Sequence, residues 1–266
     1  MKPELATLID RLTNPLLMQA SVIDWGAPVP SFGDLSTSRV ATIGLNPSNR
    51  EFVDANGKEL HGEERRFHTL NSLGITEWSK VDRQHLILML TLCKEYFKRN
   101  PYDGWFKKLD YVISGANVSY YFPSFDACHL DLIPYATSCK WTELTSKQRE
   151  LLLEITGDTL GLLLKNSHVQ LVVLNGQSVV TNFEKITNSS LEQEVMPSWT
   201  LPRKKDPGVT GVAYFGKVSS IGGLSLGREI YVIGYNHNIQ SSFGVTHEVL
   251  SAIRKWVAAI AKDVLA

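Results

Sequence analysis

The chain has little cysteine, no net charge and no long apolar run. Its 266 residues include three cysteines, Cys93, Cys128 and Cys139, and such a small, odd set is typical of a reduced, intracellular protein. Lys and Arg together number 27, as do Asp and Glu, so the formal net charge is zero. No apolar run reaches membrane-spanning length, and the first residues lack the apolar core of a signal peptide. We therefore expect a cytoplasmic, soluble protein without a membrane partner.

Several common catalytic motifs are also missing. No phosphate-binding loop of the form Gly-x-x-x-x-Gly-Lys-[Ser/Thr] occurs, and His247-Glu248 is followed by Ser251 where a zinc protease needs its second His. Residues 223–227 match the Gly-x-Ser-x-Gly pattern of serine hydrolases. A strand rather than a helix is expected after them, which favours a glycine hairpin. We expect no metal and no cofactor.

What the chain does contain is an alternation of short apolar runs with amphipathic stretches. The run that begins at residue 39 and those at 127–133, 168–174 and 229–235 predict buried strands. Helices are predicted over 4–24 (broken at Asn14-Pro15), 66–73, 82–99, 105–114, 146–165, 177–186 and 245–265. Segment 191–227 is irregular and predicts one or two short edge strands or a hairpin.

This alternation favours an α/β protein with three layers, α/β/α, around a central, mostly parallel sheet. No internal repeat or linker is visible. We expect one domain over residues 1–266, with residues 1–36 as an N-terminal helical extension.

The first predicted strand ends in a distinctive way. Residues 39–48 read Arg-Val-Ala-Thr-Ile-Gly-Leu-Asn-Pro-Ser, so that a β-branched run stops on Gly44, Asn46 and Pro47. Ligands of open α/β sheets bind at the carboxyl edge, which makes Asn46 a candidate functional residue. The alternative is a strand that simply leaves its sheet through an Asx-Pro turn.

Residues 44–48 resemble the first motif of the uracil-DNA glycosylase superfamily, in its Gly-x-Asn-Pro-Gly form, with Ser48 in place of the last glycine. The resemblance implies a DNA glycosylase that flips its target nucleotide, with Asn46 positioning a water at the sugar and with Gly44, Pro47 and Ser48 as motif backbone. Some branches of the superfamily carry an iron–sulfur cluster. With fewer than four cysteines, this chain resembles the cluster-free branches.

A second stretch, His-Leu-Asp-Leu-Ile-Pro at 129–134, places polar Asp131 near the end of an apolar strand. The corresponding strand of single-strand-selective uracil glycosylases resembles His-Asn-x-x-Pro, and Asp131 falls on the Asn that reads the base. An Asp accepts from the N4 amino group of cytosine, and if burial protonates it, it also donates to N3. Asp131 therefore favours cytosine or a 5-substituted cytosine over uracil. The alternative is a structural Asp bonded to backbone.

A third stretch, Tyr-Asn-His-Asn-Ile-Gln-Ser-Ser at 235–242, resembles the second superfamily motif, His-Pro-Ser-Pro-x-Ser, without its prolines. His237 falls on the His that faces O2 of the target base. The resemblance implies that the residues after it wedge into or contact DNA: Asn238, Ile239, Gln240 and Ser241. A plain loop histidine is the alternative.

Other features bear on how DNA would be held. An aromatic ring should stack on the flipped base, and Phe67 is the first candidate, with Phe52 as the second. The Asn175-Gly176 turn also resembles a glycine turn of the family, although simple strand–helix packing explains it equally well. Basic groups that could contact phosphates occur at 65–66, 94–99, 107–108 and 203–205.

Together these motifs predict a monomeric, monofunctional DNA glycosylase that leaves an abasic site, because no Lys lies in a matched motif. The predicted target is a modified cytosine, namely hydroxymethylcytosine or its glucosylated form in phage DNA, which suggests anti-phage defence. The alternatives are a uracil-DNA glycosylase of base-excision repair and a catalytically silent DNA-binding protein of the same fold.

Overall fold

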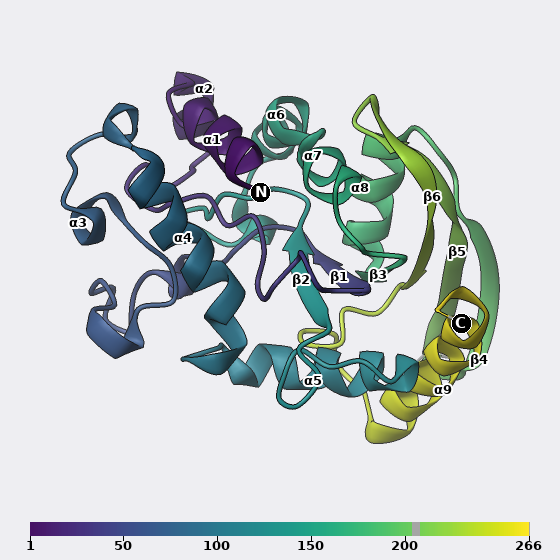
Figure 1. Ribbon diagram of the computed structural model, residues 1–266. Helices are drawn as coiled ribbons and strands as arrows, with labels where there is room; N and C mark the ends of the chain where they lie inside the picture. Colours follow the sequence, from purple (N-terminus) through teal and green to yellow (C-terminus); the bar gives the residue numbers. More distant parts are fainter. Residues whose placement is uncertain (204–207, 266) are drawn as a thin grey trace.

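The computed structural model describes residues 1–203 and 208–265, which are built around a six-stranded sheet of order β2-β1-β3-β6-β5-β4 (Figure 1). Strands β1 (Val40–Gly44), β2 (Ala127–Asp131), β3 (Leu171–Asn175) and β6 (Leu224–Tyr235) pair in parallel. Strands β4 (Glu192–Leu201) and β5 (Val209–Ile221) extend this sheet in antiparallel fashion. The predicted mostly parallel sheet is confirmed.

Successive residues of the central strands enter two different apolar layers, as the period of two in a strand requires. On β1, Ala41 and Ile43 pack in one layer, whereas Val40 packs in the other. The first layer is covered by α6 (Ser146–Thr156), α7 (Thr159–Lys165) and α8 (Gln177–Thr187), and the second by α5 (Asp103–Ile113) and α9 (His247–Val264). Helices therefore lie on both faces, as Figure 1 shows, and the predicted three-layer α/β fold is confirmed.

The helices of the first half of the chain follow local capping signals. Helices α1 (Lys2–Arg11) and α2 (Pro15–Gln19) are separated at Asn14, whose side chain caps α2. Helix α4 (Arg83–Glu95) begins after Asp82, which accepts hydrogen bonds from two backbone N–H groups. Helix α3 (Leu70–Leu73) is shorter than predicted, because Thr69 caps it and Gly74 ends it in the left-handed conformation.

One predicted helix was wrong, and one segment is more regular than predicted. The stretch 146–165 forms two helices rather than one, interrupted at Gly157 and Asp158. The carboxylate of Asp158 there accepts two hydrogen bonds of 2.7 Å from the guanidinium of Arg11, which ties the interruption to α1. Because the amphipathic pattern continues across this break, the sequence does not reveal that the helix is interrupted.

Segment 191–227 is also more regular than predicted, since it holds the long strands β4 and β5 and the start of β6. Edge strand β4 is exposed along most of its length, so its sequence has no apolar run to identify it. Gly222 and Gly223, both at positive φ, form the turn between β5 and β6. Ser225 pairs with Ser220 within the sheet, which excludes the strand-to-helix turn of a serine hydrolase.

The N-terminal helix belongs to the packed part of the molecule. Leu5 and Leu8 of α1 are fully buried in the same apolar layer as Ile43. In the part of the chain that the structure describes, no helix is long and apolar enough to cross a membrane.

Candidate active site

The carboxyl ends of β1 and β2 bring the first two motifs together. Gly44 is the direct neighbour of Asp131 across the two strands, and the Leu132 N–H continues the pairing with a 3.1 Å hydrogen bond to the Gly44 carbonyl. A cavity of about 350 Å³ opens at this edge. Its lining includes Asn46, Asp131, His129, Glu51 and Asn175. The structure therefore brings Asn46 and Asp131 together at one edge of the sheet.

The side chain of Asn46 is held in one orientation by its neighbours. Its Nδ2 donates to Thr137 Oγ1 at 3.0 Å and to the Pro47 carbonyl at 3.1 Å. The Thr137 hydroxyl in turn donates to the Cys139 carbonyl at 2.7 Å, so Oγ1 is left as an acceptor. The described residues supply no donor to Asn46 Oδ1, which leaves this oxygen available to a water in the cavity.

Asp131 is buried beside a second polar side chain from the same strand face. One of its oxygens, Oδ1, lies 3.4 Å from His129 Nε2, and His129 Nδ1 lies 2.7 Å from Thr42 Oγ1. Gly44 makes this packing possible, because a Cβ at that position would lie 2.3 Å from Asp131 Oδ1. The strand-end glycine of the motif therefore provides the room in which Asp131 stands.

Glu51 is a second buried carboxyl group in the cavity lining, and sequence analysis missed it. It lies in a 3-10 turn, η1 (Asn49–Glu51), and is 4% exposed. The Tyr96 hydroxyl donates to Glu51 Oε2 at 2.9 Å, and Arg66 Nε lies 3.9 Å from the same oxygen. Burial raises the pKa of Glu51 to about 7, against the opposing influence of Arg66 and Tyr96.

The aromatic rings in the cavity lining are not those predicted. Phe32, Trp105 and Phe106 line the cavity. Phe67 instead stacks on Tyr96, with 5.4 Å between ring centroids, and Phe52 packs against Phe67 and Trp25. Both predicted rings are buried behind the lining, because the long loop after β1 folds its aromatic residues into the core.

At the ends of β3 and β6, the structure separates the predicted residues into two groups. Asn175, Asn238 and Ser241 line the cavity. His237 lies outside the lining, where its Nε2 donates to the Trp199 carbonyl at 2.8 Å, and burial lowers its pKa. A ring nitrogen engaged by a carbonyl of β4 is not directed at a bound base.

Two of the predicted wedge residues, Ile239 and Gln240, are similarly buried or engaged. Ile239 is 1% exposed, and Gln240 is bonded to Asn175 and to the Trp105 carbonyl. Asn238 Oδ1 accepts from the backbone N–H groups of Gln240 and Ser241, and the described residues supply no acceptor to its amide NH₂. The exposed ring of this segment is Phe243, which is 80% exposed and has the Arg203 guanidinium 5.3 Å from its centroid.

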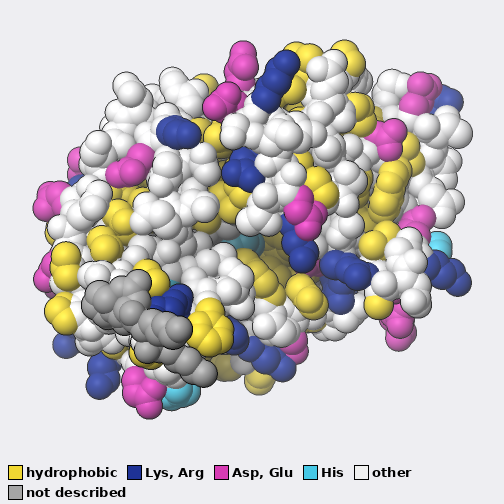
Figure 2. Space-filling view, turned by 180° about the vertical axis from the view of Figure 1, so that it is seen from behind, with side chains coloured by type: hydrophobic (Ala, Val, Ile, Leu, Met, Phe, Trp, Pro, Cys, Tyr) yellow, Lys and Arg dark blue, Asp and Glu magenta, His cyan; other side chains and the backbone are white. Residues whose placement is uncertain are grey.

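The basic side chains predicted to contact DNA phosphates differ in how many bonds they already form within the protein. Arg66 donates to the carbonyls of Asn100 and Arg50, whereas Lys94 and Lys107 pair with carboxylates. Lys204 and Lys205 lie outside the described residues. Figure 2 shows Lys and Arg side chains beside a hollow near the middle of one face, whose interior carries hydrophobic side chains.

No protein-family model and no curated protein sequence matches the chain. In residues 1–203 and 208–265, no group of three or more His, Cys, Asp and Glu side chains is arranged to hold a metal ion. Burial raises the pKa of the Cys93 and Cys128 thiols to about 12, which disfavours their nucleophilic thiolate form. The chemistry that the cavity can offer rests on amides, hydroxyls, two carboxyl groups, a histidine, the Lys140 ammonium and aromatic rings.

Proposed function

We propose that the protein is a monofunctional DNA glycosylase of the uracil-DNA glycosylase superfamily type, acting on a modified cytosine. The observation that carries this proposal is the single cavity that holds Asn46, Asp131 and Glu51 at the carboxyl edge of the sheet. This cavity offers a flipped pyrimidine both apolar walls and polar groups.

Hydrolysis begins with a water held by Asn46 Oδ1, the acceptor that the described residues leave free. The water oxygen forms a bond to C1′ of the deoxyribose, and the C1′–N1 bond breaks with its electron pair moving to the base. Glu51 takes the proton from the water, since a carboxyl group with a pKa of about 7 is a competent base near neutral pH. The sugar passes through an oxocarbenium-like transition state, as in glycoside hydrolysis.

Other groups in the cavity contact the departing base. Asp131 accepts from the N4 amino group of cytosine, and the base leaves with the C1′–N1 electron pair before it takes up a proton from water. The free amide NH₂ of Asn238 takes the role first assigned to His237 and donates to O2. Phe32, Trp105 and Phe106 supply the apolar contact with the ring.

The exposed ring of Phe243 is the candidate wedge in place of Ile239. Apolar side chains that enter the base stack must be accessible before DNA binds, and Phe243 meets this condition. Arg203 beside it supplies a positive charge for a flanking phosphate.

Base release measured by mass spectrometry tests the proposal. Purified protein is incubated separately with DNAs that contain uracil, cytosine, hydroxymethylcytosine or glucosylated hydroxymethylcytosine. We expect release of a cytosine-type base, reduced at least about 100-fold in Asn46→Ala and lost or switched toward uracil in Asp131→Asn. Release of uracil alone contradicts the assignment of Asp131. No release from any DNA contradicts the glycosylase and favours a silent DNA-binding protein.

The proposed role is defence against phages whose DNA carries modified cytosine. Expression of the protein in a host cell should lower the plating efficiency of such a phage. The same phage with unmodified cytosine should be unaffected, and Asn46→Ala should remove the protection. Equal restriction of both phages contradicts this role.

A further inference from the structure

A second cavity, of about 610 Å³, lies beside the candidate active site. The two cavities share five lining residues, Asn46, Pro47, Ser48, Lys140 and Trp141. A single layer of protein therefore separates them, and that layer includes Asn46 itself. Ser48, where the superfamily motif has glycine, is the small exposed residue at this boundary.

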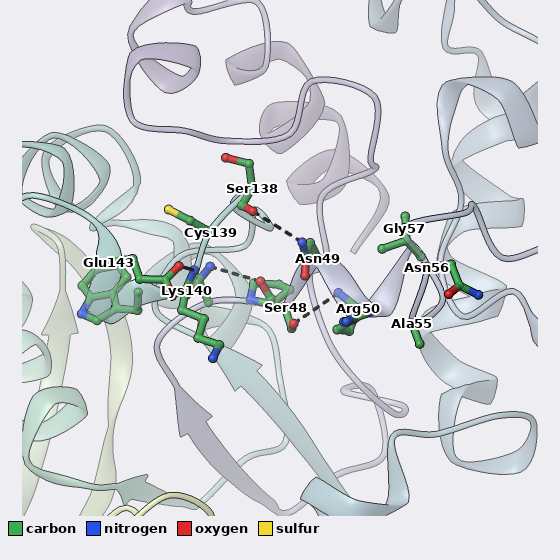
Figure 3. Close-up of a pocket in the computed structure, with 14 residues that line it drawn as sticks. Ser48, Asn49, Arg50, Ala55, Asn56, Gly57, Ser138, Cys139, Lys140 and Glu143 are labelled. Carbon is green, nitrogen blue, oxygen red and sulfur yellow. Dashed lines mark hydrogen bonds between the residues drawn. The ribbon is translucent and has the colours of Figure 1, made fainter.

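Two walls form the second cavity, and both are held by hydrogen bonds (Figure 3). The segment 48–57 supplies one wall, in which the Arg50 N–H donates to Ser48 Oγ at 3.2 Å. In the same wall, Asp54 Oδ1 accepts from the N–H groups of Asn56 at 2.8 Å and Lys58 at 2.9 Å. The segment 138–143 supplies the other, in which Glu143 accepts from the Lys140 N–H at 3.0 Å. Asn49 Nδ2 reaches the Ser138 carbonyl at 3.5 Å and joins the two walls.

The lining of the second cavity combines polar and apolar groups, and its polar groups include both donors and acceptors. It includes amides, hydroxyls, the guanidinium of Arg50, the ammonium of Lys140 and the carboxylate of Glu143. Among the described residues, neither Arg50 nor Lys140 forms an ion pair with a carboxylate. One NH₂ group of Arg50 donates to the Asp54 carbonyl, so the other donors of this guanidinium and the Lys140 ammonium remain available. Mixed donors and acceptors suit a neutral, hydroxyl-rich group, whereas a phosphate would be opposed by the Glu143 carboxylate.

The order of atoms around a pyrimidine ring connects the two cavities. In the proposed complex, N1 lies near Asn46, N3 and N4 face Asp131, and O2 faces Asn238. The C5 edge then lies on the side of the ring opposite O2. Asn238 stands at the end of β6, while the shared wall follows β1 and β2, so a substituent on C5 is directed toward the second cavity.

We propose that the second cavity binds the glycosyl group carried on C5 of a modified cytosine. Assigning the cavity this way rests on the proposed excision of modified cytosine in the neighbouring cavity. The base and its deoxyribose occupy the smaller cavity. A hexose on C5 extends past Ser48 into the larger cavity. Recognition of the glycosyl group comes from the polar lining at residues 49–57 and 138–143.

A binding experiment with inactive protein tests the proposal. All proteins carry Asn46→Ala, and each is titrated with single-stranded oligonucleotides that differ at one position: cytosine, hydroxymethylcytosine or glucosylated hydroxymethylcytosine. The parent should bind the glucosylated oligonucleotide about tenfold more tightly than the hydroxymethylated one, as expected from one or two additional hydrogen bonds. Ala55→Trp, which places a large ring in the second cavity, should bring this ratio close to one.

The control is Ala259→Trp, which changes another exposed alanine, on α9, away from both cavities. It should keep the tenfold ratio, and circular dichroism should show that both Trp variants are folded. A ratio near one in the parent overturns the proposal, as does an unchanged ratio in Ala55→Trp. Failure of the glycosylase proposal would be seen separately, as absence of base release by the unmodified protein from all four DNAs.

Discussion

At the residue scale, Glu51 is the cavity side chain whose charge is most strongly affected by its surroundings. Burial disfavours its ionised form, while the Tyr96 hydroxyl and the Arg66 guanidinium favour it. The balance leaves a pKa of about 7. Asp131, in the same cavity, adds a smaller effect that raises the pKa of Glu51 further. A carboxyl group of this kind can change its charge during a reaction at neutral pH.

The first prediction concerns the pH dependence of base release. If Glu51 accepts the proton of the attacking water, kcat should rise about tenfold per pH unit below about pH 7 and level off above it. Glu51→Gln keeps the size of the side chain and should lower kcat at least about 100-fold while removing this rise. Single-turnover rates between about pH 5 and pH 9 would measure it.

Tyr96→Phe serves as the matched control for this profile. It removes the hydrogen bond that stabilises the ionised carboxylate, so the pKa of Glu51 should rise and the midpoint should move about one pH unit upward. A rate that falls as pH rises through about 7 would show that Glu51 acts as an acid instead.

At the scale of elements, the site depends on how closely the ends of β1 and β2 approach each other. The pairing of Gly44 with Asp131 leaves no room for a side chain on Gly44. A methyl group there would also lie 2.9 Å from His129 Nε2. The glycine of the motif is therefore explained by packing at the strand edge as well as by the turn that follows.

The second prediction is that Gly44→Ala displaces Asp131 and disturbs the cavity. Overpacking at a buried position should lower the free energy of unfolding by about 1–3 kcal/mol, and discrimination between cytosine-type bases and uracil should weaken. Urea unfolding and the base-release assay would measure the two effects. Gly104→Ala, at an exposed position of α5 with no atom near the added Cβ, should leave both unchanged or slightly raise stability. Equal effects of the two substitutions would contradict the packing explanation.

At the scale of the whole molecule, the buried Glu51 couples folding to pH. Its pKa is about 7 in the folded protein and 4.5 for the free side chain, so the folded state holds its proton more tightly than the unfolded state. The stability that this provides is fully present below about pH 4.5 and is lost as pH rises through about 7.

The third prediction follows from this linkage. Relative to Glu51→Gln, the unmodified protein should lose about 3 kcal/mol of unfolding free energy between about pH 4.5 and pH 8. Urea unfolding of both proteins at the two pH values would measure this loss. The contributions of the other titrating groups cancel because both proteins contain them. The exposed Glu63→Gln control should show no such change, and a loss of the same size in that control would point away from Glu51.

Much of the architecture could be predicted from sequence because the central strands and amphipathic helices carry their own periodic patterns. Examples are the apolar run at 39–44 and the apolar residues at helical spacing along α4. The capping residue Asp82 marks the start of that helix. The length of strands β4 and β5 was underestimated, because an exposed edge strand needs no apolar pattern. The break between α6 and α7 escaped because a residue distant in sequence, Arg11, bonds to Asp158 there.

For the site, sequence alone determined that Asn46 and Asp131 stand at the ends of buried strands, because the end of an apolar run marks the sheet edge. The structure made these two strands neighbours. Only the tertiary structure decided that Glu51 enters the cavity, that Phe32 and Trp105 wall it, and that His237 is occupied by a carbonyl of β4. These placements depend on loop conformations and on contacts between residues far apart in the chain. Local periodicity does not encode such contacts, since they arise only when the packed layers bring distant loops to one edge of the sheet.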